Sequence, residues 1–292
     1  MNYKLNFTYK TGKEIKTTEI SNDDISFNLR QTENGLTLTV IPKKEISDIS
    51  FYLEREYEYP QDSRFFANGF QSWTDTKEFA KNELMADEGL VGKGLFGKSP
   101  FGMNLVGDYT FVEQSKECGV FHSISFAYVR NEKNIDLFGS LNDRTGYTII
   151  YADMNKNTLR FSKDVEGIII SEPYELLNLY FDNGGYDEVF DRYFAKMNVK
   201  PLTDKKIKGY TSWYNYYQNI NEKIILRDLD AISEKTDKVN TFQIDDGYQT
   251  AVGDWLSINK TKFPNGMKPI VEKIHAKGWQ AGLWLAPFGA QK

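Results

Sequence analysis

Residues 241–288 read TFQIDDGYQTAVGDWLSINKTKFPNGMKPIVEKIHAKGWQAGLWLAPF, and they carry the clearest pattern of secondary structure in the second half of the chain. It opens with an apolar run that ends at Ile244, which predicts a buried strand. Between residues 267 and 278 apolar side chains recur at helical spacing, with Pro269 in the first turn and a glycine at the end, which predicts an amphipathic helix. A second apolar run, Trp279–Pro287, predicts another strand. Strand, helix and strand in this order are typical of a parallel β/α unit.

The same pattern begins further upstream. Gly209–Tyr214 predicts a first strand, and Asn221 is placed to cap an amphipathic helix that leads to a second strand at Val239–Ile244. A polar stretch, Thr203–Lys208, reads as the linker that precedes these elements. An open doubly wound sheet and a closed barrel both fit this alternation of strands and helices.

The first 180 residues have strand character of a different kind. Short runs alternate apolar and polar residues and are separated by turn signals such as Asn34-Gly35. Examples are Ile25–Arg30, Leu36–Ile41, Ile49–Leu53, Gly119–Tyr128, Gly146–Tyr151 and Tyr174–Phe181. Roughly ten such strands predict a β-sandwich. A helix over Tyr186–Met197 follows, so we expect a β-sandwich domain with a terminal linking helix at 1–200 and a partial β/α domain at 201–292.

Composition excludes several classes of function. The net charge is −5 without a long basic run, which argues against a nucleic-acid partner. No stretch approaches 18 apolar residues and the amino terminus has no apolar signal region, so we expect no membrane association and a cytoplasmic protein. Cys118 is the only cysteine and there are two histidines, which predicts no disulfide framework, no metal site and no cofactor.

A phosphate-loop pattern occurs at Gly92–Ser99, which reads GKGLFGKS. That motif binds phosphate only between a buried strand and a helix. The residues before it are mostly polar, and Pro100-Phe101-Gly102 opposes a helix directly after it. We therefore interpret the segment as a flexible loop and keep nucleotide binding only as an alternative, to be tested by the effect of ATP and Mg²⁺ on thermal stability.

Asp245 and Asp246 are the residues with the strongest chemical signal. They follow a predicted strand in a β/α pattern, where active sites collect at the carboxyl ends of strands. Two adjacent carboxylates repel each other and need hydrogen-bond donors, which a polyol supplies. Turn formation by Asp-Asp-Gly is the alternative explanation. Trp213 and Trp284 lie near the ends of the neighbouring predicted strands, where their rings could stack on a sugar or simply fill the interface between strand and helix.

Several ordered motifs together resemble family 36 of the glycoside hydrolases, which are retaining α-galactosidases and related galactosyl transferases. The motifs are Asn68–Trp73 (NGFQSW), Gly209–Tyr217 (GYTSWYNYY), Phe242–Tyr248 (FQIDDGY), Gly253–Leu256 (GDWL), Lys262–Met267 (KFPNGM) and Gly282–Phe288 (GLWLAPF). The resemblance implies a β-supersandwich followed by the first β/α units of a (β/α)₈ barrel, truncated after the third barrel strand. It also implies a galactose-containing oligosaccharide as the partner, and it leaves self-association of the full-length form open.

The resemblance assigns roles to five residues. Asp245 and Asp246 match the aspartates that bind the O4 and O6 hydroxyls of galactose. Trp213 and Trp284 match subsite walls, and Trp73 matches a ring that the β-domain brings to the active site. The chain departs from the pattern at Tyr210-Thr211, where many members have Trp-Cys, and at Tyr248, where many have Trp.

The family's nucleophile and acid/base lie on the fourth and after the sixth barrel strands, beyond Lys292. We therefore expect no catalytic residue in this chain, no activity from it alone, and poor solubility unless a second polypeptide completes the barrel. The complete protein would be an α-galactosidase that acts by double displacement. The alternatives are a non-catalytic galactoside-binding protein, or an α-N-acetylgalactosaminidase or galactosyl transferase of the same fold.

Overall fold

The computed structural model describes residues 2–70, 74, 76–85, 112, 115–200, 202–287 and 289. The chain divides into two compact units, Met1–Lys200 and Pro201–Lys292, and each has its own hydrophobic core. Two features singled out in the sequence, Trp73 and the Gly92–Ser99 loop, lie outside the described residues.

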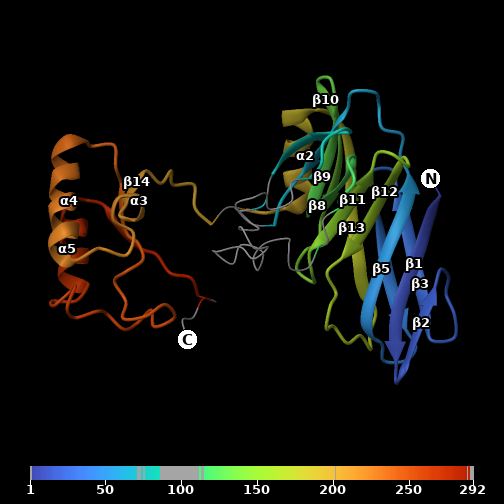
Figure 1. Ribbon diagram of the computed structural model, residues 1–292, viewed down its shortest axis with the longest axis horizontal. Helices are drawn as coiled ribbons and strands as arrows, with labels where there is room; N and C mark the ends of the chain where they lie inside the picture. Colours follow the sequence, from blue (N-terminus) through green and yellow to red (C-terminus); the bar gives the residue numbers. More distant parts are fainter. Residues whose placement is uncertain are drawn as a thin grey trace. The chain divides into compact units, whose positions relative to one another are not determined.

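The first unit contains two antiparallel sheets (Figure 1). The six-stranded sheet has the order β2 (Glu14–Thr18), β1 (Tyr3–Thr11), β5 (Ser47–Glu56), β12 (Thr158–Lys163), β11 (Thr148–Asp153) and β8 (Val120–Ile124). The seven-stranded sheet has the order β3 (Ile25–Thr32), β4 (Gly35–Pro42), β13 (Tyr174–Gly185), β10 (Asn134–Ser140), β9 (Phe126–Asn131), β6 (Arg64–Ala67) and β7 (Lys77–Ala80).

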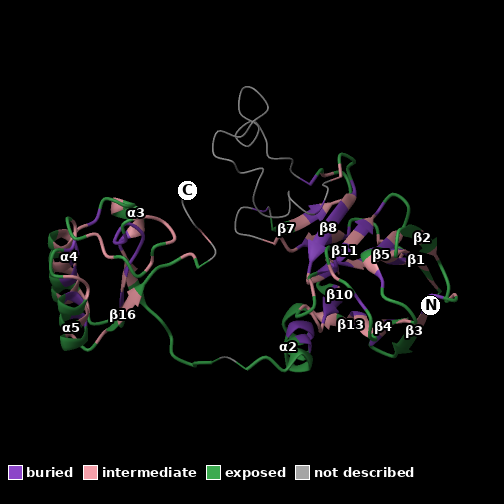
Figure 2. Cartoon of the chain, turned by 90° about the horizontal axis from the view of Figure 1, so that it is seen from below, coloured by how far each residue is buried: buried purple, intermediate pink, exposed green. Residues whose placement is uncertain are grey.

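The core of this unit lies between the sheets and follows the alternation of the strands. In β4 the side chains of Leu36, Leu38 and Val40 are buried, and in β5 those of Phe51 and Leu53 are buried, with more exposed residues between them. Successive side chains of a strand point to opposite faces, so this pattern places one face of each sheet in the interior. Figure 2 shows that buried residues lie along the strands of this unit. The predicted β-sandwich is confirmed.

The prediction of a single strand over Gly119–Tyr128 is wrong. Ser125 adopts a positive φ of 67°, and the chain leaves the six-stranded sheet at the end of β8 to enter the seven-stranded sheet as β9. The Ser125 amide donates to the carbonyl of Thr148, outside the regular ladder. The pattern of apolar and polar residues indicates which residues are buried, and both β8 and β9 are mostly buried. The pattern therefore does not reveal that the chain changes sheets between them.

Helix α2 (Tyr186–Met197) directly follows β13 and covers part of the seven-stranded sheet. It buries Val189, Phe190 and Tyr193. The Tyr193 hydroxyl donates to the carbonyl of Ser140 at 2.7 Å, which fixes the helix to the end of β10. The helix ends at Asn198, whose φ of 51° is left-handed.

The second unit is a three-stranded parallel sheet with helices between its strands. Its elements are β14 (Gly209–Thr211), α3 (Trp213–Tyr216), α4 (Glu222–Lys235), β15 (Thr241–Ile244), α5 (Lys268–Ala276) and β16 (Gln280–Leu283). The strand order is β14-β15-β16 and both pairings are parallel. Helices α4 and α5 lie side by side (Figures 1 and 2). This is the arrangement expected for the first β/α units of a barrel.

Local sequence explains why these helices form and where they pack. The Asn221 side chain accepts from the amide of Ile224 at 2.9 Å, which caps α4 as predicted. Pro269 lies in the first turn of α5, where its missing N–H is harmless. Both helices contribute buried isoleucine or leucine side chains to one core with Phe242 and Ile244 of β15. The side chains of Thr241 and Gln243 point to the opposite face of β15.

The strands of this unit are shorter than predicted. The strand expected at Gly209–Tyr214 ends at Thr211, and the one expected at Trp279–Pro287 spans only Gln280–Leu283. The strand expected at Val239–Ile244 begins at Thr241. Apolar residues adjoin the strands without pairing in the regular ladder, so hydrophobicity overestimates the length of the strands. Trp213 consequently lies in a helix and Trp284 just after a strand.

Candidate sugar-binding site

Four of the five predicted site residues lie at one edge of the parallel sheet. Asp245 and Asp246 directly follow β15 and are 7% and 6% exposed. Trp213 begins α3 after β14, and Trp284 follows β16. Because the strands are parallel, their carboxyl ends meet at the same edge. The fifth residue, Trp73, is outside the described residues.

Asp245 is held by donors from two neighbouring strands. Its Oδ2 accepts from the Thr211 hydroxyl at 2.8 Å and from Nε2 of Gln243 at 2.9 Å. Its Oδ1 accepts from the amide of Asp246 at 2.8 Å. The Asp245 amide donates to Oγ of Ser212 at 3.0 Å. Burial of a carboxylate is costly unless its oxygens accept hydrogen bonds, and these contacts satisfy both oxygens of Asp245.

Asp246 is held by two glutamines. Its Oδ2 accepts from Nε2 of Gln218 at 2.7 Å, and its Oδ1 accepts from Nε2 of Gln249. The Oε1 atom of Gln249 accepts from the Gly247 amide at 3.1 Å, so both ends of that amide group are engaged. None of these donors is a cation, which leaves the negative charge of Asp246 without a paired ion among the described residues.

The tryptophans make ring contacts of their own. Trp213 packs edge-on against Tyr217, with ring centroids 5.2 Å apart. Trp284 packs edge-on against Trp255 at 5.8 Å, and 37% of its surface is exposed. Trp255 was not among the predicted site residues, although it belongs to the quoted GDWL motif. No ring contact or hydrogen bond in the described part of the chain joins Trp213 or Trp284 to the two aspartates.

Trp255 is carried on a loop between β15 and α5. The Asn259 amide donates to the carbonyl of Tyr248, and the Thr250 amide donates to that of Ser257, both at 2.9 Å. These bonds close the loop on itself and bring its tip back toward the edge of the sheet. Sequence reasoning missed Trp255 because it lies within a loop and not directly after a strand, and its contact with Trp284 identifies it.

Two tyrosines beneath this edge are kept neutral. Burial raises the pKa of Tyr248, and the nearby charge of Asp246 raises it further. Burial also raises the pKa of Tyr210, together with the hydrogen bond that its hydroxyl donates to Asp228 at 2.7 Å. The Tyr210 ring stacks on Phe242 with centroids 4.5 Å apart. Both tyrosines pack in the core of the second unit, and their hydroxyls do not titrate near neutral pH.

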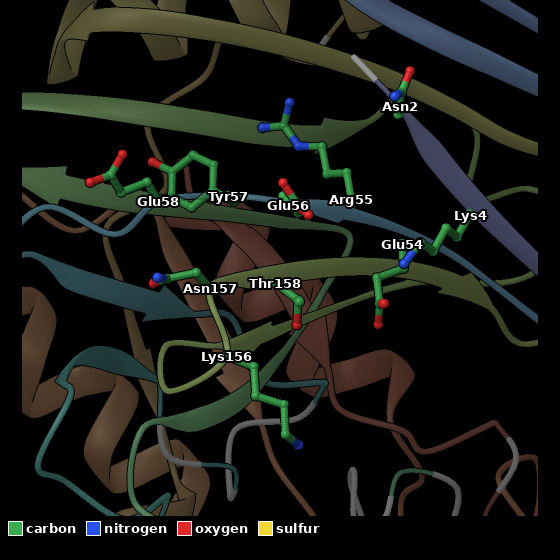
Figure 3. A pocket seen from close by; sticks show the side chains of 10 residues that line it. All are labelled: Asn2, Lys4, Glu54, Arg55, Glu56, Tyr57, Glu58, Lys156, Asn157 and Thr158. Atoms are coloured by element: carbon green, nitrogen blue, oxygen red, sulfur yellow. The ribbon is translucent and has the colours of Figure 1, made fainter.

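A cavity of about 760 Å³ lies elsewhere, at the end of β5 in the first unit (Figure 3). Its lining includes three cationic side chains (Lys4, Arg55 and Lys156) and three glutamates (Glu54, Glu56 and Glu58). In Figure 3 these charged groups point in different directions and do not converge on a common centre. A binding pocket is expected to present convergent polar groups, so we assign the candidate site to the aspartate pair.

The described residues contain no cluster of three or more metal-ligating side chains. None of the described helices is long and apolar enough to span a membrane. In this structure the two aspartates accept hydrogen bonds, and carboxylate oxygens are also suitable acceptors for hydroxyl groups.

Comparisons with known proteins relate this chain to α-galactosidases. Residues 188–291 match the melibiase family model. An α-galactosidase of Oryza sativa subsp. japonica is 33% identical over 88 residues, which cover 26% of this chain and 20% of the relative. The α-galactosidase Mel36A of Lactobacillus acidophilus is 25% identical over 185 residues, which cover 58% of this chain and 23% of the relative. The match with the latter extends beyond the β/α unit into the sandwich, because 185 residues exceed the length of the second unit.

Solved structures show the same fold. The α-galactosidase of Thermus thermophilus in complex with stachyose superposes with a TM-score of 0.60 at 24% identity, covering 89% of this chain and 48% of that one. The chain thus spans about half the length of this structure. The resemblance indicated by the sequence motifs is confirmed: this chain is similar to the amino-terminal portion of an α-galactosidase, with residues 188–291 matching the melibiase family.

Proposed function

We propose that this chain is the amino-terminal part of a retaining α-galactosidase and that Asp245 and Asp246 bind the hydroxyls of a terminal galactose. The observation that carries the proposal is a pair of buried, donor-held carboxylates within the residues that match the melibiase family. The Thermus relative was crystallised with stachyose, which supports an oligosaccharide as the substrate class.

The carboxylates retain capacity for a ligand. An ionised carboxylate has about four lone-pair positions. At Asp246 the two glutamine amides occupy two of them, so about two remain for hydroxyl donors. Hydrogen bonds from neutral hydroxyls to an ionised acceptor are among the stronger ones, which suits recognition of adjacent sugar hydroxyls. Trp284, with its partly exposed ring, supplies an apolar surface for the C–H face of the sugar.

Neither aspartate is proposed as the nucleophile or the acid/base. A retaining glycosidase needs two carboxyl groups about 5–5.5 Å apart on either side of the scissile bond. The oxygens of both aspartates accept hydrogen bonds from neighbouring residues, an arrangement that suits a binding role. We therefore propose that the 292-residue polypeptide alone has no hydrolytic activity. Turnover of an aryl α-galactoside by the purified chain that is lost in an Asp246→Asn variant would contradict this.

Binding is the direct test of the proposed site. Titration of the chain with galactose, followed by tryptophan fluorescence, should saturate, and Asp246→Asn should weaken the affinity about tenfold or more because it removes an ionised acceptor. Asp204→Asn, in the exposed segment before β14, is the matched control and should bind galactose like the parent. Equal affinity of the two variants would refute the assignment.

Two alternatives are separated by further ligands. A non-catalytic galactoside-binding protein would bind galactose and remain inactive even when the rest of a barrel is supplied as a second polypeptide. An α-N-acetylgalactosaminidase would prefer N-acetylgalactosamine in the same titration, and a galactosyl transferase would pass galactose to an acceptor sugar faster than to water.

A further inference from the structure

We infer that Gln218 and Lys262 are positioning residues that set the orientation of Asp246 and thereby the selectivity of the site for galactose. This inference rests on the proposed function. Neither residue was a predicted site residue, and they come from different segments, one after α3 and the other in the loop before α5.

Gln218 reaches Asp246 from an exposed turn. The residue itself is exposed, yet its Nε2 lies 2.7 Å from a carboxylate oxygen of Asp246, which is 6% exposed. A long side chain at the surface loses rotamer entropy when it is held in one geometry. The bond forms reliably only if the backbone of Gln218 is itself fixed.

Three features fix that backbone. Tyr217, the preceding residue, has φ 50° and ψ −130°, a conformation that non-glycine residues rarely adopt and that costs about 1–3 kcal/mol. Gly247 approaches so closely that a Cβ atom there would lie 2.5 Å from the Gln218 carbonyl oxygen. Lys262 donates from Nζ to the carbonyls of Gln218 at 2.7 Å and of Gly247 at 3.0 Å.

Lys262 therefore joins the two segments that follow β14 and β15. One of its contacts holds Gln218, and the other holds the residue next to Asp246. Loss of this lysine would release the strained turn at Tyr217 and allow the Gln218 amide to leave Asp246. The carboxylate would then keep only Gln249 as a side-chain donor and could rotate. Because Asp246 has few fixed donors, its rotation would change which hydroxyl positions it can accept from.

The test compares two sugars that differ only at C4. The affinities of the full 292-residue chain for galactose and for glucose are measured by fluorescence titration. In Gln218→Leu and Lys262→Met the ratio of these affinities should fall about five- to tenfold, corresponding to about 1–1.4 kcal/mol. Lys262→Arg, which keeps the positive donors, should recover most of the ratio. A simple loss of folded protein would reduce both affinities together and leave the ratio unchanged.

Matched controls lie in the same unit. Lys277→Met removes a lysine that also bridges two segments, through its bond to Ser233 at 2.8 Å, but on the outer helices. Gln280→Leu removes an exposed glutamine from β16. Both controls should keep the parent ratio. If Gln218→Leu and Lys262→Met also keep it while the parent binds galactose, the inference is overturned and the proposed function stands.

A second readout does not depend on sugar binding. In the parent the side-chain amide ¹⁵N–¹H resonances of Gln218 should be displaced from free-glutamine positions and exchange slowly, and both Lys262→Met and Asp246→Asn should abolish this. Free-glutamine resonances in the parent would overturn the inference even if no sugar binds. Absence of galactose binding together with a displaced Gln218 resonance would instead overturn the proposed function alone.

Discussion

Tyr248 stands where many proteins of the resembled family have Trp, and its side chain packs in the core next to the candidate site. Its side chain is fully buried against the core beneath Asp246, and its hydroxyl has no hydrogen-bond partner among the described residues. A buried hydroxyl left unsatisfied costs about 1–3 kcal/mol. We expect Tyr248→Phe to leave the free energy of unfolding unchanged or raise it by about 1 kcal/mol, measured by urea denaturation.

The control for this substitution is Tyr193→Phe in α2. That tyrosine is equally buried, but its hydroxyl donates to Ser140, so its removal should lower the free energy of unfolding by about 1 kcal/mol. Four of the five tryptophans lie in the second unit, so fluorescence follows Tyr248→Phe and circular dichroism follows Tyr193→Phe. A loss in Tyr248→Phe as large as that in Tyr193→Phe would mean that the Tyr248 hydroxyl is satisfied.

Gly247, next to Asp246, is constrained by its backbone conformation and by its close approach to Gln218. Its φ is 106°, and an added Cβ would lie 2.5 Å from the Gln218 carbonyl oxygen and 2.7 Å from the Gln218 Cα. We expect Gly247→Ala to destabilise the second unit by at least about 2 kcal/mol, from backbone strain and overlap together. In Gly278→Ala the added Cβ would have no atom within 4 Å, so only the backbone strain at a φ of 76° remains. We expect this variant to lose about 1 kcal/mol of stability. Similar losses in the two variants would show that the approach to Gln218 is unimportant.

At the scale of elements, the sequence predicts the type of each segment better than its ends. The helical spacing of apolar residues and the Asn221 cap identify α4 and α5 correctly. The run over Gly119–Tyr128 hides a change of sheet at Ser125, because a left-handed serine leaves no periodic signal. Asp245 and Asp246 could be placed at a strand end from the sequence. Gln218 and Lys262 could not, because their contacts join residues 28 to 44 positions apart.

An ion cluster links the ends of β1, β2, β3 and β4 and gives the sandwich a pH dependence. Lys16 at 2.6 Å and Lys44 at 2.9 Å hydrogen-bond to the buried carboxylate of Asp24, and the Tyr9 hydroxyl also donates to it. These donors, Lys16 first and then Lys44, hold the pKa of Asp24 well below its usual range. A carboxyl whose pKa is lowered by folding stabilises the fold above its ordinary pKa of about 4, and loses that contribution as the pH falls further.

We therefore expect Asp24→Asn to lower the melting temperature of the first unit at pH 7. The difference from the parent should be full above about pH 4 and shrink steadily on acidification below it. Circular dichroism melts at a series of pH values measure this. Asp23→Asn changes the neighbouring residue and should follow the parent at every pH. A difference between Asp24→Asn and the parent that is independent of pH would show that packing, and not charge, is responsible.

At the scale of the whole molecule, the two units differ in how much apolar surface they bury. Among the described residues, the main core of the sandwich contains 28 buried hydrophobic residues, whereas the core of the second unit contains nine. In the second unit Leu283, Trp284 and Leu285 are 43%, 37% and 46% exposed at and after the edge strand β16. Exposed apolar strand edges favour association between chains.

The fragment 1–200 should therefore be soluble and melt cooperatively, whereas the fragment 201–292 should associate and bind a hydrophobic dye. The segment 202–208 between them is exposed throughout, so brief proteolysis should cut the chain there and release the sandwich intact. Size-exclusion chromatography and circular dichroism of both fragments test this. Replacing Leu283 and Leu285 with lysine should reduce the association of 201–292, since it places charge on the edge. If 1–200 fails to fold while 201–292 is monomeric, burial within each unit does not determine stability, and the sandwich depends on the second unit for its fold.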